Sequence, residues 1–214
     1  MKAVMAIAKR MLASNYISYI ITAAVVLCAT SSGNVVLSRG NYTWLLVLMS
    51  PFFFVFYDYK KLMHLGCDKK DYYLSAIVCY AFLALVTSLA NTVIHSCFDT
   101  LSDRTVINMI DVCRWSENGI IVSWLQQLCF LFMIMSFLHL LLSMQERWYG
   151  WLTDAVLAAV ICVFTPVAPL RRLLASFFSL VMLNGNAPVH IAVCIMLSAL
   201  FSAVSLIVLK HKTL

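Results

Sequence analysis

The chain has 214 residues, of which 63% are apolar and 11% charged, and its formal net charge is +6. A soluble globular domain carries about 25% charged residues, so this chain lacks the polar side chains that would cover a water-facing surface. Its composition therefore argues against a soluble nucleic-acid-binding protein and places the basic residues at a membrane surface, where anionic lipid attracts Lys and Arg. The predicted fold class is an all-α polytopic integral membrane protein, formed as one transmembrane domain over residues 1–214.

The N-terminal stretch 1–14 combines small apolar residues with Lys2, Lys9 and Arg10. A cleaved signal peptide places its basic residues ahead of the apolar core, whereas two of these three come late. The apolar run that follows is also long enough to cross a membrane. We therefore expect residues 1–14 to form an interfacial helix that leads into the first span.

Six further apolar runs approach the roughly 20 residues that a transmembrane helix needs. The predicted spans are residues 16–37, 43–57, 72–95, 119–144, 151–168 and 188–209. The second is the shortest, and it ends in a group of aromatic residues that is typical of a membrane interface. Residues 58–71 then form an inner segment and residues 97–118 the longest outer loop.

A seventh apolar run, residues 173–183, is too short to cross a bilayer as a helix. It follows Arg171 and Arg172 and precedes Asn184-Gly185-Asn186, which is a turn signal. We therefore expect residues 170–187 to form a re-entrant or interfacial segment on the outer side, between the fifth and sixth spans.

The distribution of Lys and Arg predicts the orientation. With the N-terminus inside, ten of the fifteen basic residues lie in inner segments and five in outer ones. A seventh span would place the basic C-terminal tail outside and weaken this asymmetry. We therefore expect a multi-pass protein of the plasma membrane with both termini in the cytoplasm.

Two of the eight cysteines, Cys97 and Cys113, lie in the predicted outer loop. Disulfides persist outside the cytoplasm, so a bridge between these two residues and a pair of free thiols are both compatible with the sequence. The other six cysteines have no metal-binding spacing, and packing is their expected role.

Motifs that carry chemistry are absent from the sequence. It contains no HExxH, no GxSxG and no GxxxxGK[ST] phosphate loop. The five histidines are far apart, and an interhelical hydrogen bond is the favoured role for His95 and His139. Asp154 is expected near the inner headgroups. The sequence therefore predicts no catalytic residue, metal site or bound cofactor on this chain.

A charged island, residues 58–73, separates two apolar runs. Its residues Leu65, Gly66, Lys69, Lys70 and the pair Tyr72-Tyr73 follow the pattern Leu-Gly-x-x-Arg/Lys-Lys/Arg-x-aromatic-aromatic. This pattern resembles the cytoplasmic end of the second span in bacterial ABC-2-type transporter permeases. The motif is short, and a lysine stands at position 69 where that family more often has arginine. The span number, the N-terminal helix and the outer re-entrant segment agree with the family, whereas a large outer domain is missing.

The resemblance implies that this region is a coupling helix that docks on a partner ATPase. The residues expected to dock are Tyr59, Leu62, Met63, Leu65, Gly66, Lys69 and Lys70. The four apolar ones would form an exposed edge, Gly66 would end the helix, and the lysines would meet lipid phosphate or an acidic partner. Without the resemblance, a solvated inner loop that only fixes the topology is the simpler interpretation.

The predicted function is therefore that of the permease subunit of an ATP-driven exporter. Two such chains would form the pathway, and ATP and Mg²⁺ would bind to a separate ABC ATPase subunit. One alternative is the substrate-binding membrane subunit of a vitamin uptake system, which would hold its ligand within a single chain. The other is an integral-membrane enzyme that modifies lipids.

Overall fold

The computed structural model describes residues 2–29, 34–102, 104–145 and 147–211. Helices dominate these ranges, and two short strands interrupt them. The elements in chain order are α1 (Lys2–Ser14), α2 (Tyr16–Cys28), β1 (Val35–Leu37), the 3-10 helix η1 (Arg39–Thr43), α3 (Trp44–Phe53), the π-helix η2 (Phe54–Asp58), α4 (Tyr59–His64), α5 (Lys69–Ile94), the π-helix η3 (His95–Asp99), β2 (Thr105–Ile107), α6 (Met109–Val112), the 3-10 helix η4 (Trp115–Asn118), α7 (Ile120–Met144), α8 (Trp148–Phe164), α9 (Ala168–Val181) and α10 (Ala187–His211).

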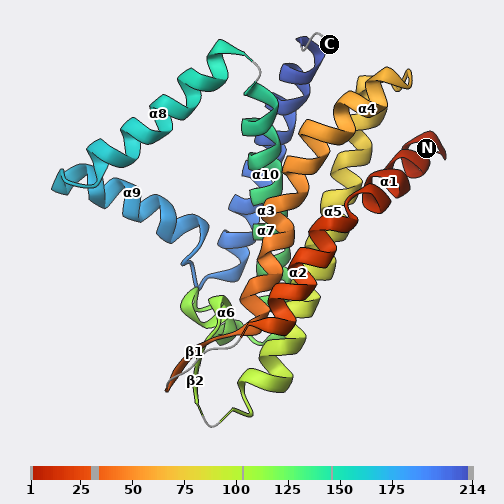
Figure 1. Cartoon of the computed structure of the whole chain (residues 1–214). Coiled ribbons are helices and arrows are strands. Elements are labelled where there is room, and N and C mark those ends of the chain that lie inside the picture. Colours follow the sequence, from red (N-terminus) through yellow and green to blue (C-terminus); the bar gives the residue numbers. More distant parts are fainter. Residues whose placement is uncertain (1, 30–33, 103, 146, 212–214) are drawn as a thin grey trace.

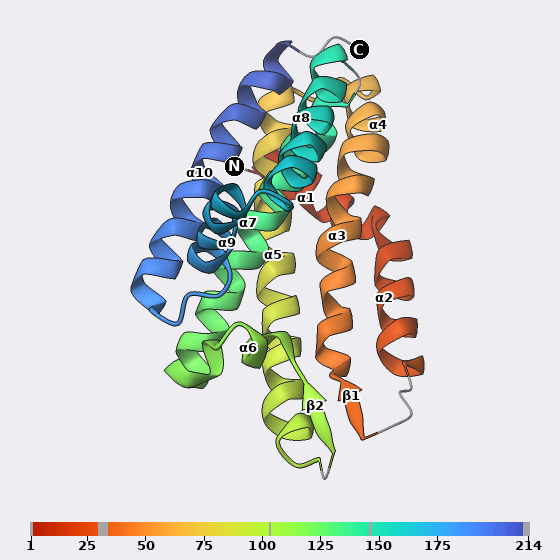
Figure 2. The same cartoon turned by 90° about the vertical axis from the view of Figure 1, so that its left-hand side faces the viewer.

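The long helices run side by side between two chemically different ends (Figures 1 and 2). The α4–α5 turn, the α7–α8 turn and the last turn of α10 lie together at what we call the basic end. Strands β1 and β2 and helix α6 lie at the opposite, sheet end. The stretches α3–α4, α5, α7 and α10 each carry the chain from one of these ends toward the other.

Several helices are long and apolar enough to cross a membrane, which makes the chain a polytopic membrane protein. Within the described residues, four continuous helical stretches meet this test: Arg39–His64, Lys69–Asp99, Ile120–Met144 and Ala187–His211. Two bent pairs, α1–α2 at 48° and α8–α9 at 118°, raise the number to six if each pair is one span. The all-α class predicted from the sequence is confirmed, apart from the two strands of three residues each.

Two predicted span boundaries are wrong. The first span was expected over residues 16–37, but helix α2 ends at Cys28 and residues 35–37 form strand β1. The second was expected over 43–57, but the helical stretch continues to His64. It continues because the π-helix η2 joins α3 to α4 without a break, although the chain becomes charged there.

Helices α5 and α7 form the centre of the molecule, with α10 packed along α7. Small residues such as Ala76 and Ala84 are fully buried on α5, which lets neighbouring helices approach closely. Tyr80 of α5 and His139 of α7 are joined by a hydrogen bond of 2.7 Å between Oη and Nδ1. The interhelical contact expected for His139 is therefore present.

A two-stranded parallel sheet and a buried polar group close the sheet end. Strand β1 pairs with β2 in the register Val35–Thr105 to Leu37–Ile107. Below it, the Asn108 amide nitrogen lies 2.8 Å from a carboxylate oxygen of Asp99 and 3.1 Å from Asn91 Oδ1. In the same region Cys97 and Cys113 are both free thiols, so the disulfide left open by the sequence is not formed.

Helices α8 and α9 form an arm that stands away from the bundle (Figure 1). Gly150 is the one buried residue of α8, and Val181 is the one buried residue of α9. The arm follows a tight α7–α8 turn, since a Cβ atom on Gly150 would lie 2.2 Å from the Met144 carbonyl oxygen. Helix α9 and the turn after it fall on residues 170–187, where the sequence predicted a separate segment after the fifth span.

Candidate functional site

The candidate site is the α4–α5 turn, residues 65–68, at the basic end. Helix α4 ends there because Gly66 has a φ of +79°, a left-handed conformation that favours glycine. The amides of Gly66 and Cys67 donate to the carbonyls of Met63 and Leu62, both at 3.0 Å. Gly66 therefore ends the helix, as the sequence predicted.

Helix α5 begins directly after this turn. Asp68 has an extended backbone conformation, and its carboxylate accepts a hydrogen bond of 3.4 Å from the backbone amide of Lys70. An acidic N-cap is favourable because it satisfies a free amide and faces the positive end of the helix dipole. The turn is thus a short, capped link between two long helices.

The apolar edge expected from Tyr59, Leu62 and Met63 is not exposed. These side chains are only 1%, 5% and 8% exposed, because α4 packs this face against the bundle. Tyr59 meets Tyr72 of α5 with ring centroids 5.1 Å apart. Leu65, in contrast, is 61% exposed. Of the four apolar docking residues predicted, Leu65 is therefore the one that a partner could touch.

The predicted lysines of the turn behave differently from one another. Lys70 is exposed, whereas Lys69 is half-buried and its Nζ donates to the carbonyl of Lys210 at 3.3 Å. Arg147 donates to the carbonyl of His211 at 2.6 Å. Two cations therefore meet the last carbonyls of α10, where the negative end of the helix dipole favours positive charge.

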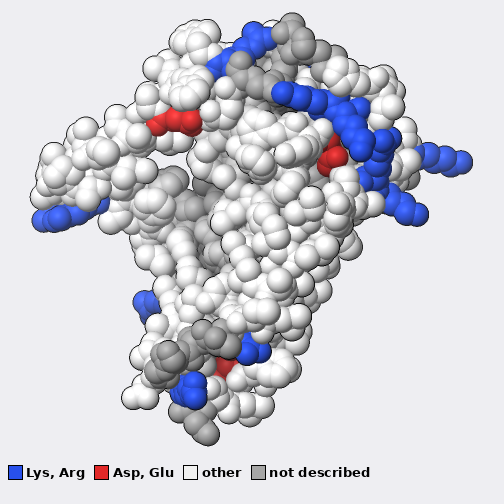
Figure 3. All heavy atoms as spheres, viewed as in Figure 1, with Lys and Arg blue, Asp and Glu red and all other residues white. Residues whose placement is uncertain are grey.

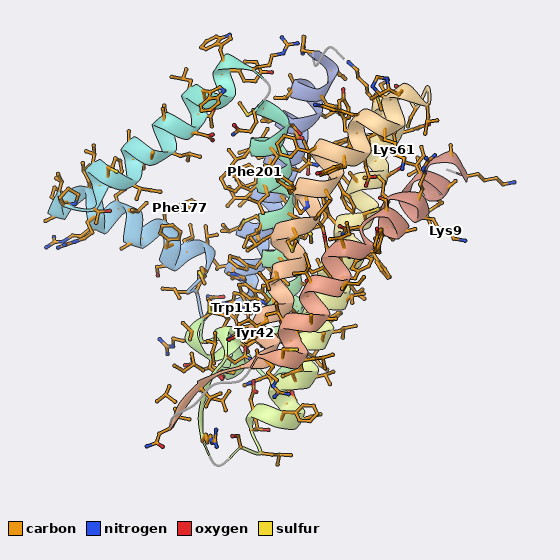
Figure 4. The ribbon with its side chains drawn as sticks, in the orientation of Figure 1. Lys9, Tyr42, Lys61, Trp115, Phe177 and Phe201 are labelled. Carbon is orange, nitrogen blue, oxygen red and sulfur yellow. The ribbon has the colours of Figure 1, made fainter. Side chains whose placement is uncertain are left out.

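The turn belongs to a wider basic surface, on which Lys60 and Lys61 of α4 are also exposed. Figure 3 shows Lys and Arg concentrated over this end of the molecule, and Figure 4 shows Lys9 and Lys61 pointing outward from it. Such a surface can meet anionic lipid or an acidic protein face. Leu65 adds one apolar contact at its edge.

Sequence reasoning missed the polar link between the N-terminal helices and this region. Ser14 Oγ lies 2.8 and 2.9 Å from the two carboxylate oxygens of Asp58, which is 6% exposed. One residue later, Asn15 Nδ2 donates to Ser50 Oγ at 2.9 Å. Asp58 is a carboxylate at the edge of the charged island, but no local pattern indicates its partner 44 residues away.

The other candidate polar residues are spread through the molecule and do not form one site. His95 lies 3.7 Å from Asp99 and 3.5 Å from Asp111 at the sheet end. Asp154 accepts a hydrogen bond of 2.7 Å from Gln145 near the basic end. Among the described residues, no group of three or more His, Cys, Asp and Glu side chains could hold a metal ion.

Comparisons with protein-family models, with curated proteins and with solved structures find no match for this chain. We therefore infer its function from its own residues.

Proposed function

We propose that this chain is the membrane subunit of an ATP-driven exporter of the ABC-2 type, and that its α4–α5 turn docks on a separate ATPase. One observation carries the proposal: an exposed Leu65 and a basic surface lie on a short, capped turn that joins two long membrane helices. The resemblance of residues 65–73 to the family's coupling region supports the same role.

The geometry suits the transmission of movement. The turn links the continuous stretches Arg39–His64 and Lys69–Asp99, so a displacement of the turn acts on two spans together. Asp58, one residue before α4, accepts a hydrogen bond from the Ser14 hydroxyl at the junction of α1 and α2. A partner that moves the turn would therefore also move the N-terminal helices, as in rigid-body switching between two packed states.

In this proposal the basic end faces the cytoplasm of a bacterial cell, and ATP and Mg²⁺ bind to the ATPase. A second copy of the chain, or a related chain, completes the pathway. Electrostatic attraction between the basic surface and an acidic ATPase face would favour encounter and register, while Leu65 would supply apolar contact.

The proposal is tested by co-expressing the tagged full-length chain with the Walker-type ATPase encoded nearest to its gene. Co-purification and ATP hydrolysis in lipid vesicles are measured for the wild type and for Leu65→Asp. A charge introduced at an interface anchor costs about 2 kcal/mol or more, so we expect at least about a thirtyfold loss of ATPase binding.

The matched control is Leu101→Asp, because Leu101 is 80% exposed at the sheet end. It should leave both measurements unchanged. Equal ATPase retention by the wild type and Leu65→Asp would contradict docking at the turn. Tight binding of a small ligand by the purified chain alone would instead support a vitamin-uptake subunit.

A further inference from the structure

An apolar cavity of about 230 Å³ lies between α9 and the α7–α10 pair. All of its lining side chains are apolar, and half of them are phenylalanines: Phe130 and Phe137 of α7, Phe177 and Phe178 of α9, and Phe201 of α10. Figure 4 shows Phe177 and Phe201 on the two facing elements. A cavity without polar partners does not hold ordered water, so its natural occupant is an apolar group.

The two walls of this cavity differ in exposure. On the bundle side, Phe137 packs on Phe201 with ring centroids 5.1 Å apart, and Phe130 packs on Trp115 at 5.5 Å. On the arm side, Phe177 and Phe178 are about half exposed. The cavity therefore has a packed wall on the bundle side and opens along α9, where lipid surrounds a membrane protein.

Helix α9 presents two distinct faces. Leu174, Phe178 and Val181 follow Arg171 at helical spacings of three, seven and ten residues, so this arginine stands at the end of the apolar face. Arg172 instead shares the opposite surface with Ser176 and Ser179. At 1.5 Å per residue, Arg171 lies about 10 Å along the helix from Phe178.

The two arginines have no anionic partner within the described part of the chain. They are the fourth and fifth residues of α9, so they lie near its N-terminal, positive end and not at the C-terminal end, which favours cations. An anion supplied from outside the chain would relieve both conditions. Figure 3 shows blue Lys or Arg atoms at the outer corner of the α8–α9 arm, away from the basic end.

We propose that the cavity binds an acyl chain of an anionic phospholipid whose phosphate contacts Arg171. The separation between Arg171 and the cavity matches a lipid that places its headgroup at the start of α9 and its hydrocarbon along the apolar face. A helix from a second copy would not fit, because a helix with its side chains is about 10–12 Å across and the cavity is only about 230 Å³. The inference requires that the chain lies in a membrane, but it does not depend on the proposed exporter function.

The test uses the full-length chain in phosphatidylcholine vesicles that contain a small fraction of phosphatidylglycerol with a diazirine in the middle of one acyl chain. After irradiation, mass spectrometry maps the labelled residues, without ATP or a partner protein. We expect labelling to concentrate on the apolar face of α9 and on α10 around Phe201. Unlabelled phosphatidylglycerol should compete for these positions, and additional phosphatidylcholine should not.

The variant Arg171→Gln should lower labelling at these positions about fivefold, which corresponds to the ~1 kcal/mol typical of one basic side chain at an anionic lipid surface. Arg172→Gln is the matched control and should lower it less, because Arg172 lies on the other face. Leu197→Trp, which fills the cavity from α10, should remove labelling inside it while leaving lipid-exposed α8 labelled.

Three results would overturn the proposal. One is labelling of the cavity walls no stronger than that of the exposed face of α8. Another is equal labelling in the two arginine variants. The third is a protein–protein cross-link formed by a photo-reactive phenylalanine analogue placed at Phe177 or Phe178, which would assign the cavity to a second copy. The two arginines are exposed, so neither substitution should disturb folding. The comparison between the two arginine variants therefore remains valid even if the Leu197 variant does not fold.

Discussion

Cys113 illustrates how packing controls the chemistry of a single residue at the sheet end. Its side chain is fully buried between α6 and η4, and burial raises the pKa of its thiol from 9.0 to about 12. The thiolate is the reactive form of cysteine, so this residue stays unreactive near neutral pH. Cys97, on the same part of the chain, is exposed.

We predict that a maleimide modifies Cys97 but not Cys113 in the folded protein, at pH 7 and at pH 8.5. Peptide mass spectrometry with and without detergent denaturation measures the two sites, and both should react after denaturation. Because the pKa is raised in the folded state, this thiol favours folding below pH 9.0, and that contribution is lost as the pH rises from there toward 12. Modification of Cys113 in the native protein, or a reductant-sensitive link to Cys97, would contradict the structure.

At the same scale, the exposure of the predicted docking residues could not be read from the sequence. Tyr59, Leu62 and Met63 have the spacing of one helical face, and the sequence alone does not say whether that face meets a partner or the protein's own core. Tyr59, for example, packs on Tyr72, which the turn between α4 and α5 brings next to it. The turn itself was predictable, because Gly66 is a local signal.

The long helices were predictable from the sequence where each corresponds to one uninterrupted apolar run. Helices α5, α7 and α10 agree with the expected spans within about four residues, because long apolar runs determine them. The end of α2 at Cys28 was missed because apolar residues resume at 35–37 after the polar stretch 30–34 and resemble a continuation of the span. Those residues pair with β2, about seventy residues away, and such a pairing leaves no local pattern.

The bend between α8 and α9 was only partly predictable. Two prolines, Pro166 and Pro169, favour an interruption of the helix, and helix α9 begins at Ala168 with a proline in its first turn. The two helices meet at 118°, and no local sequence pattern indicates that angle. A break is therefore visible in the sequence, whereas its direction is not.

We expect the stability of the sheet end to depend on the buried polar cluster around Asn108, next to the two strands. Asn108 is fully buried, and besides Asp99 and Asn91 its amide nitrogen lies 3.1 Å from Ser38 Oγ. Its side-chain oxygen accepts the backbone amide of Ile110 at 3.0 Å. One side chain thus connects the start of η1, the end of α5 and the start of α6.

We predict that Asn108→Ala lowers the free energy of unfolding by about 2–3 kcal/mol, because it leaves several buried polar groups unpaired. Thermal unfolding in detergent, followed by circular dichroism, measures the effect. Thr105→Ala, an exposed position on β2, is the control and should change the midpoint little. Equal midpoints for Asn108→Ala and the control would show that this polar group does not hold the sheet end.

At the scale of the whole molecule, the chain direction limits the topology. Helix α7 ends at the basic end and α10 begins near the sheet end, so α8 and α9 together carry the chain across the molecule (Figures 1 and 2). Helix α1 and the end of α10 therefore lie toward the same end of the molecule. This arrangement agrees with the uneven distribution of Lys and Arg. Among the described residues, the sheet end carries three of them, Arg39, Arg104 and Arg114, and α9 carries two; the others lie toward the basic end.

These charges predict that the basic end faces the cytoplasm, because basic residues flanking spans tend to be retained there. We predict that in intact bacterial cells a membrane-impermeant maleimide modifies the Arg104→Cys variant, and that it modifies the Lys61→Cys variant only after the membrane is permeabilised. Both native side chains are exposed, so access and not burial decides the result. Labelling is measured against the native cysteines by peptide mass spectrometry, with Cys97 expected to follow Arg104→Cys. The opposite pattern would place the α4–α5 turn outside the cell, where no ATPase could reach it, and would exclude the proposed function together with the orientation.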